Sequence, residues 1–372
     1  MSHRLAGLLR PELAELAAYA PPEVPGITVR LDANEAPANR SSAVKEAVAS
    51  AVSRVALERY PDARARELKS RLAERTGARA EDLLIGTGSD EVISLLMTAF
   101  ARPRQSARGT REHPPNAVVL APTPTFVMYR VTSRGHGLTP MDVPLDAAWD
   151  LDVASMKRAI EFAAPNLVFI ASPNNPTGNR VSEARLREVI AAAGDALVVI
   201  DEAYVDFASG GSLRGLRATH DNVAILRTLS KIGLAALRIG WLEADEAIVR
   251  EVDKVRQPFN VSATSQAAAS AVLTEAWDEV RAHIDGVVAE RVRVARETDA
   301  LDQGFTVTPS EANFLWVKTS KPAVEISGAL ASAGILVRSF HAIGGRLAHQ
   351  LRITIGSPQE NDRLLEALRA CT

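Results

Sequence analysis

The chain has 372 residues, a length that favours one large domain with a smaller one attached. Apolar residues make up 47% of it, and the formal net charge of -2 gives no general attraction to nucleic acid or to an anionic membrane. The single cysteine, Cys371, excludes an internal disulfide and a cysteine zinc cluster, so a cytoplasmic location is expected. We find neither the apolar run of a signal peptide nor a stretch of about 18 consecutive apolar residues.

Short apolar runs predict strands, and helical patterns lie between them. Most runs are apolar at successive positions, as in strands buried on both faces of a sheet. Residues 90–100 and 180–193 are predicted helices, the second beginning near Ser182 and stopping at Gly194. This alternation predicts a mostly parallel sheet with helices on both sides. The predicted strands are 83–85, 118–120, 167–170, 197–200, 223–226 and 239–242.

After Asn260 the pattern changes. Residues 262–301 predict one or two long helices, and strands follow at 313–317, 335–338 and 351–355. We therefore expect an N-terminal arm and part of the small domain in 1–45, a large cofactor-binding domain in 46–265 and a small C-terminal domain in 266–372. The stretch 102–116, with four arginines among Pro, Gly and Ser, is interpreted as a solvated loop rather than a partner-binding patch.

Lysine is scarce in the chain, which has only seven. Lys231 stands out because it lies in an apolar run just after the predicted strand 223–226. A lysine here either extends its amine to solvent or, in a desolvated site, acts as a nucleophile that forms a Schiff base. Its immediate neighbours favour the first interpretation, and the motifs described next favour the second.

Asp201 follows four apolar residues at the predicted end of a strand. Ligands bind at the carboxyl ends of strands in open parallel sheets. A carboxylate there would pair with a protonated pyridine nitrogen and keep the ring cationic, with Tyr204 bonded to the ring's phenolic oxygen. On local grounds, a helix cap or a metal ligand explains Asp201 equally well.

Two turns are predicted at the same edge of the sheet. The SPNNPTG segment at 172–178 forms a tight turn that brings Asn175 to this edge. Residues 84–91 indicate a strand, a glycine turn and a helix start, whose free N–H groups bind phosphate, although an ordinary capped helix has the same pattern. Ser230 and Arg238 would complete the phosphate site.

In this order, the motifs resemble the fold-type I, pyridoxal-phosphate-dependent aminotransferases of class I/II, and within them the histidinol-phosphate aminotransferases. The resemblance covers about residues 31–357. It implies an α/β fold, in which a large domain with a mostly parallel mixed sheet is flanked by helices and joined to a smaller α+β domain. The motifs are LDANE at 31–35, RYPD at 59–62, PTFVMY at 124–129, SPNNPTG at 172–178, Asp201 with Tyr204, RTLSK at 227–231 and LRIT at 351–354.

The resemblance implies pyridoxal 5'-phosphate as cofactor and a role for each matching residue. Lys231 would hold the cofactor and act as general base and acid, and Phe126 would stack on the ring where many relatives have Tyr. The implied catalytic residues are Lys231, Asp201 and Tyr204. The implied cofactor-binding residues are Gly88, Ser89, Asp90, Phe126, Asn175, Asp201, Tyr204, Thr228, Ser230, Lys231, Arg238 and, from the other subunit of a homodimer, Tyr60. The implied substrate-binding residues are Tyr19, Asn34, Arg338 and Arg352.

The implied reaction transfers the amino group of L-histidinol phosphate to 2-oxoglutarate, giving imidazole acetol phosphate and L-glutamate in histidine biosynthesis. An aromatic amino-acid aminotransferase or a phosphothreonine decarboxylase-like enzyme would share the fold. A non-catalytic pyridoxal-phosphate-binding regulator would need an added DNA-binding module, for which we see no segment. A Rossmann-type dehydrogenase would need a Gly-x-Gly-x-x-Gly motif after an early strand, and the sequence has none there. The seven histidines lack metal-ligand spacing, so no metal is expected.

Overall fold

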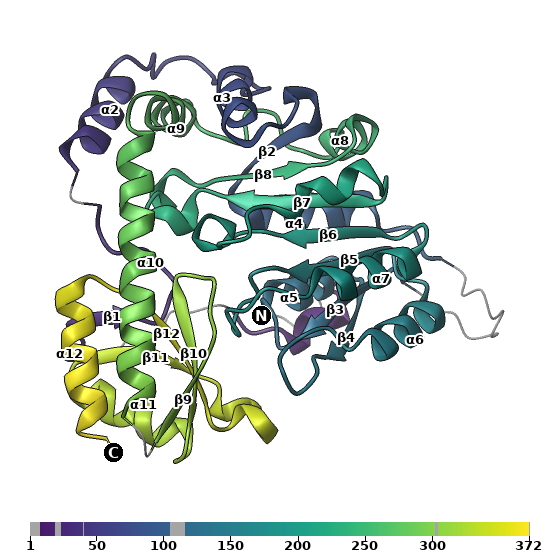
Figure 1. Ribbon diagram of the computed structural model, residues 1–372. Coiled ribbons are helices and arrows are strands. Elements are labelled where there is room, and N and C mark those ends of the chain that lie inside the picture. The colour runs from purple at the N-terminus through teal and green to yellow at the C-terminus, as the bar shows by residue number, and fades with distance from the viewer. Residues whose placement is uncertain (1–7, 19–23, 40, 105–115, 302–303, 372) are drawn as a thin grey trace.

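The computed structural model describes residues 8–18, 24–39, 41–104, 116–301 and 304–371. They form two sheets, and the long helix α10 (Trp277–Asp299) runs from the larger part of the molecule to the smaller one (Figure 1). Among these residues, no helix is long and apolar enough to cross a membrane.

The larger sheet has seven strands in the order β2-β8-β7-β6-β5-β3-β4. β8 is antiparallel to both of its neighbours, and every other pair is parallel, which confirms the predicted mostly parallel sheet. All six strands predicted before Asn260 are present. The bounds are β2 Leu83–Thr87, β8 Ile239–Glu243, β7 Val223–Thr228, β6 Leu197–Asp201, β5 Leu167–Ala171, β3 Val118–Thr123 and β4 Thr139–Pro144.

The edge strand β4 was not predicted from the sequence. Its segment, TPMDVP, contains two prolines and a charged residue. Proline is tolerated at a sheet edge, because only one side of an edge strand has to supply ladder hydrogen bonds. The signal that marks a central strand is therefore missing from β4.

Helices cover both faces of the larger sheet. α4 (Gly88–Ala99), α5 (Met128–Gly135) and α8 (Glu246–Asp253) pack on one face, and α6 (Val153–Ala163) and α7 (Glu183–Ala193) on the other. In β6, Leu197 and Val199 enter the first core, while Val198 and Ile200 enter the second. Because both faces are buried, the strands are apolar at successive positions. Ser182 is the N-cap residue of α7, as predicted, although its side chain makes no capping hydrogen bond.

The predicted helical stretch 262–301 is two helices, α9 (Ala263–Glu275) and α10, separated at Ala276. α9 packs against α2 (Ser42–Ser53) and α3 (Arg66–Thr76) beside the larger sheet, as Figure 1 shows. The domain boundaries predicted at 45/46 and 265/266 stay a prediction.

The smaller sheet has five strands in the order β1-β11-β12-β10-β9. Only the β1–β11 pair is parallel. β1 comes from the N-terminal part of the chain, so the smaller sheet is built from both ends of the sequence. The bounds are β1 Val29–Leu31, β9 Phe305–Thr308, β10 Phe314–Thr319, β11 Ile335–Ser339 and β12 Gln350–Thr354, with helices α11 Ala323–Ser332 and α12 Pro358–Arg369 beside them.

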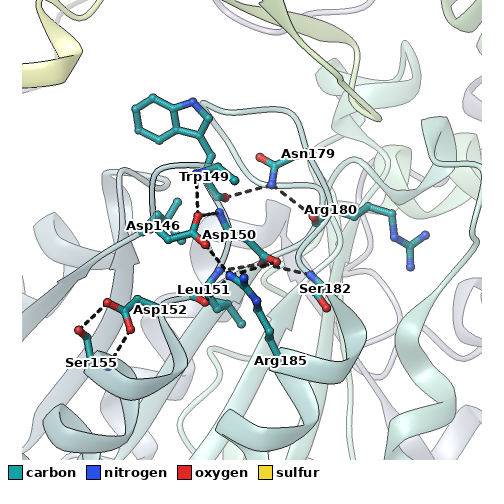
Figure 2. Close-up of polar contacts among 12 residues, drawn as sticks. Asp146, Trp149, Asp150, Leu151, Asp152, Ser155, Asn179, Arg180, Ser182 and Arg185 are labelled. Atoms are coloured by element: carbon teal, nitrogen blue, oxygen red, sulfur yellow. Dashed lines mark hydrogen bonds and ion pairs between the residues drawn. The ribbon is translucent and has the colours of Figure 1, made fainter.

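A loop of the larger part, residues 145–151, reaches the smaller part. The Asp146 carboxylate accepts hydrogen bonds from the backbone N–H groups of Ala148 and Asp150 and pairs with Arg185, which makes the loop a closed polar network (Figure 2). The Trp149 indole projects from this network (Figure 2) and meets Trp316 of β10 edge to face, at 5.7 Å between ring centroids. The loop therefore contacts the smaller sheet through the Trp149 ring.

Arg346, from the smaller part, closes this contact. Its guanidinium donates to the carbonyl oxygens of Leu145 (2.8 Å) and Asp146 (2.7 Å) and lies 3.7 Å from the centroid of the Trp149 ring. We name Trp149, Trp316 and Arg346 the clasp. It joins the two parts of the molecule at a point other than α10.

Candidate active site

Most of the predicted site residues line one pocket. It lies at the carboxyl ends of the parallel strands. Ten of the twelve predicted cofactor-binding residues line it. Gly88 and Tyr60 are the two that do not. The lining residues are Ser89, Asp90, Phe126, Tyr129, Ala171, Pro173, Asn175, Asp201, Ala203, Tyr204, Thr228, Ser230, Lys231 and Arg238.

Asp201 ends β6 at the floor of this pocket and is 5% exposed. The hydroxyl of Tyr129 donates to its Oδ2 (2.6 Å), and the backbone N–H of Ala203 donates to its Oδ1 (3.0 Å). Burial raises the pKa of Asp201 to about 6, against the lowering effect of these two donors. No ion pair neutralises Asp201 within the described residues, so the carboxylate suits a cationic ring nitrogen.

Lys231 lies across the pocket in the short helix η5 (Ser230–Ile232), directly after β7. Its Nζ is 5.8 Å from the centroid of the Tyr204 ring. In the part of the chain that the structure describes, the ammonium group has no hydrogen-bond or ion-pair partner. The amine is thus half-buried and lines a pocket instead of extending along the surface.

Tyr204 is fixed by a residue of the smaller part. Asn34 Nδ2 donates to the Tyr204 hydroxyl at 2.9 Å, and Asn34 itself is held by Thr354, whose Oγ1 accepts from its backbone N–H. Asn34 is 1% exposed and has a positive φ of 55°. Asparagine tolerates this left-handed conformation better than most residues. Asn34 is buried behind Tyr204, and its predicted contact with the substrate stays a prediction.

The turn after β5 is tied to the segment that follows β3. Asn174 accepts a hydrogen bond from Thr125 Oγ1 (2.8 Å) and donates to the carbonyl oxygen of Pro124 (3.0 Å). The next residue, Asn175, lines the pocket, as does Phe126. The two predicted ring-contacting segments are therefore held together by one buried amide.

At one end of the pocket the groups suit an anion. Ser89 lies in the first turn of α4, where backbone N–H groups are unpaired and the helix dipole is positive. Arg238 Nη1 is 3.5 Å from Ser230 Oγ, and its Nη2 is 3.9 Å from Asp90. These donors and the guanidinium match the needs of a phosphate group.

The loop at this end needs two glycines. A Cβ on Gly88 would lie 2.6 Å from Arg238 Nη2, and a Cβ on Gly240 would lie 2.4 Å from the backbone of Gly88. Gly88 has a φ of 78° and donates its N–H to the Arg238 carbonyl oxygen at 2.8 Å. Gly88 thus shapes the anion-binding end without lining the pocket. Thr228 Oγ1 donates to the Ile239 carbonyl oxygen and supports the same region.

The smaller sheet contributes two arginines. Arg352 on β12 donates from Nη1 to Asn175 Oδ1 (2.7 Å) and from Nη2 to the Asp32 carbonyl oxygen. Arg338 on β11 is its register partner, so both side chains leave the same face of the sheet. Arg338 is exposed and has no partner among the described residues. An anion bound between these two cationic side chains would be attracted by both.

Among the described residues, Tyr60 lies away from this pocket. Tyr60 is 81% exposed and stacks on Phe259, with 4.6 Å between ring centroids, in a separate surface hollow that also includes Leu57 and Pro258. Tyr19 and most of the basic loop 102–116 lie outside the described residues.

Sequence reasoning missed Tyr129. The PTFVMY motif contains this residue, but only Phe126 was assigned a role there. Tyr129 and Asp201 are 72 residues apart, and their contact depends on how α5 packs on the larger sheet. The spacing of Tyr129 and Ser133 by four residues places both on the buried face of α5, but no local pattern shows that the Tyr129 hydroxyl meets a carboxylate.

The chain matches the model of the family described as aminotransferase class I and II over residues 27–368. It is 39% identical to histidinol-phosphate aminotransferase 1 of Burkholderia lata, over 97% of each chain, and 38% identical to histidinol-phosphate aminotransferase of Aquifex aeolicus, over 96% of each. The solved structure of histidinol-phosphate aminotransferase from Sinorhizobium meliloti in complex with pyridoxal-5'-phosphate has a TM-score of 0.81 at 26% identity, covering 98% of each chain. The chain therefore belongs to the class I and II aminotransferases.

Proposed function

We propose that this chain is a pyridoxal-phosphate-dependent aminotransferase that transfers the amino group of L-histidinol phosphate to 2-oxoglutarate. The products would be imidazole acetol phosphate and L-glutamate. The names of its relatives support this choice of donor. The observation that carries the proposal is the pocket itself, where Lys231 and the buried Asp201 lie beside an anion-binding helix start.

The residues of the pocket fit pyridoxal phosphate. Lys231 would hold its aldehyde carbon covalently, Asp201 its ring nitrogen, and Asn175 with Tyr204 its phenolic oxygen. Phe126 would cover a ring face, and Ser89, Ser230 and Arg238 would hold the phosphate. When bound, the cofactor supplies an electron sink that stabilises negative charge at the donor's α-carbon.

Lys231 moves the proton in this proposal. As a free, neutral amine, Lys231 Nζ would take the proton from the donor's α-carbon and then return it as an acid in a 1,3-proton shift, with the cofactor supplying the electron sink. Lys231 belongs to a short helix directly after a buried strand, which fixes the backbone position from which its side chain enters the pocket. Tyr204, fixed by Asn34, holds its hydroxyl on the same side of the pocket.

The paired arginines of the smaller sheet suit a donor and an acceptor that both carry anions. Arg352 would bind a carboxylate of glutamate or 2-oxoglutarate, and Arg338 with Arg352 would bind the phosphate of histidinol phosphate. This follows from their register on adjacent strands and from the absence of a partner for Arg338 among the described residues.

A homodimer is part of the proposal. Tyr60, Leu57 and Phe259 expose large apolar side chains close together, which is unusual on a surface that stays in water. We propose that this surface meets a second copy and that Tyr60 reaches the partner's cofactor phosphate. A cytoplasmic site of action is also proposed, on the basis of the single cysteine.

The test is a half-reaction. The purified protein is loaded with pyridoxal phosphate, and histidinol phosphate is added without any keto acid. Loss of the yellow absorbance and formation of pyridoxamine phosphate would support both cofactor and donor. Parallel samples receive histidinol, phenylalanine and phosphothreonine.

Each outcome has a separate meaning. Conversion by phenylalanine but not by histidinol phosphate would replace the donor with an aromatic amino acid. Release of carbon dioxide from phosphothreonine would indicate a decarboxylase. A protein that gains no yellow absorbance with pyridoxal phosphate would contradict the role of Lys231 itself.

A further inference from the structure

Tyr129 is held in one orientation by aromatic packing. It lies in the first turn of α5, is 2% exposed, and stacks on Phe169 of β5 with ring centroids 4.7 Å apart and planes 15° apart. Phe126 meets its ring edge to face at 5.6 Å. The ring therefore cannot turn away from the sheet, and its hydroxyl points to the end of β6.

The hydroxyl of Tyr129 makes one of the two hydrogen bonds that hold the Asp201 carboxylate. It occupies Oδ2 while the N–H of Ala203 occupies Oδ1, so the plane of the carboxylate is fixed by a donor on each oxygen. Each oxygen retains a second acceptor position. A ring N–H arriving in the pocket would thus meet a carboxylate that is already oriented.

The Tyr129 hydroxyl keeps its proton, and so remains a donor, at neutral pH. Burial, together with the nearby Asp201 carboxylate, raises the pKa of Tyr129 well above its ordinary value. The other ionisable groups around Asp201 are Asp90 on α4, Lys231 in η5 and the phenol of Tyr204. The charge of Asp90 disfavours the ionised form of Asp201, whereas the charge of Lys231 favours it. The Tyr129 hydroxyl, which stays protonated, supports the ionised form of Asp201 by its hydrogen bond.

We propose that Tyr129 is a positioning residue, which acts through Asp201 to hold that carboxylate charged and oriented toward the ring nitrogen of the cofactor. This inference rests on the proposed cofactor site and adds to it a residue with no covalent or proton-transfer role. The phenol ring of Tyr129 also contacts Phe126. Tyr129 would therefore align both Asp201, which faces the cofactor's ring nitrogen, and Phe126, which covers a face of the cofactor's ring.

The test removes only the hydroxyl. Tyr129→Phe keeps the stacked ring and the apolar packing, so the variant is expected to fold. The matched control is Ser133→Ala, which removes another buried hydroxyl from α5, one turn later, whose bond goes to the Tyr129 carbonyl oxygen and not to Asp201. Three quantities are measured for each protein: the Kd for pyridoxal phosphate, the kcat and KM of the half-reaction, and the pH dependence of unfolding of the cofactor-free chain.

For Tyr129→Phe we expect the Kd for pyridoxal phosphate to rise roughly 10-fold, as for loss of a hydrogen bond to a charged group. The half-reaction kcat should fall by about the same factor with KM nearly unchanged, because Tyr129 touches no substrate. In the pH dependence of unfolding of the cofactor-free chain, the midpoint of the transition assigned to Asp201 should move to higher pH. Ser133→Ala should change none of these quantities.

A double variant separates positioning from packing. If Tyr129 acts through the charge of Asp201, Tyr129→Phe should have no further effect in an Asp201→Asn background. An equal loss in both backgrounds, or a Tyr129→Phe protein with wild-type Kd and pH midpoint, would overturn the proposal. The Kd and the pH midpoint need no amino donor, so a wrong choice of donor leaves this test intact. A chain that binds no pyridoxal phosphate at all would instead refute the proposed function.

Discussion

The two halves of the candidate site are built differently. On the larger sheet, the site residues follow buried strands, and the Asp201 carboxylate is held by hydrogen bonds from Tyr129 and Ala203. On the smaller sheet, Arg352 donates a hydrogen bond to Asn175 of the other half, while Arg338 is exposed without a partner among the described residues. The difference suggests that the cofactor half is formed before any ligand arrives, whereas the substrate half depends on an anion and on how the two sheets are held together.

The largest expected effect lies in the cofactor half. Lys231→Ala should lower the half-reaction rate by about 10³-fold or more, because a positioned general base contributes roughly 10²- to 10⁴-fold and the covalent attachment is lost as well. Single-turnover absorbance with histidinol phosphate measures it. Lys254→Ala, which removes a surface lysine paired with Glu251, is the control and should be silent. Wild-type turnover by Lys231→Ala would refute the assignment.

The substrate half should respond selectively. Arg338→Ala should raise KM for histidinol phosphate by roughly 10- to 100-fold, as expected for a lost charged hydrogen bond, and leave histidinol, which lacks the phosphate, unaffected. Arg352→Ala should impair the reaction with 2-oxoglutarate as well. Steady-state kinetics with the three substrates tests this, with Arg158→Ala on α6 as a distant control. Equal losses for both donors would show that Arg338 does not contact the phosphate.

Burial of Asp201 should be measurable as a cost in stability. The pKa of this carboxyl rises from 3.8 to about 6 on folding. Between these pH values the carboxyl is mostly protonated in the folded protein and mostly ionised in the unfolded chain. The stability of the cofactor-free wild type should therefore fall, relative to Asp201→Asn, by roughly 3 kcal/mol as the pH rises from 4 to above 6. Denaturant unfolding at several pH values measures this difference. A difference that stays constant across the range would show that folding does not raise the pKa of Asp201.

Pyridoxal phosphate should reverse that cost, because its ring nitrogen would supply the missing cation. The loaded wild type should gain more stability from the cofactor at pH 7 than the loaded Asp201→Asn protein. A cofactor that stabilised both proteins equally would argue against a pair between Asp201 and the ring.

The smallest effect is expected at the clasp. Arg346→Ala should lower the free energy of unfolding by only about 1 kcal/mol, since the contact is partly solvated. The KM of both substrates should still rise several-fold, while the Kd for the cofactor stays constant. Arg180→Ala, which removes a guanidinium bonded to Gly211 within the larger part, is the control. A changed cofactor Kd in Arg346→Ala would show that the two halves are not separate.

Much of the cofactor half could be predicted from the sequence, because its chemistry is local. Strands buried on both faces are apolar at successive positions, and the polar residue that follows each of them must lie at the sheet edge. Asp201 at the end of β6, Lys231 after β7 and the SPNNPTG turn after β5 each follow this rule. The glycine turn before α4 is local in the same way. β4 was missed because an edge strand with two prolines has no such pattern.

The tertiary structure decided what joins distant segments. Tyr129 with Asp201, Asn34 with Tyr204 and Arg352 with Asn175 are 72, 170 and 177 residues apart. The clasp spans a similar gap, since Arg346 and Leu145 are 201 residues apart. The sequence by itself determined which strands are buried and which polar groups lie at their ends, because burial and turn formation depend on neighbouring residues. Which side chain orients another depends on how helices and the second sheet pack, and no local pattern encodes that geometry.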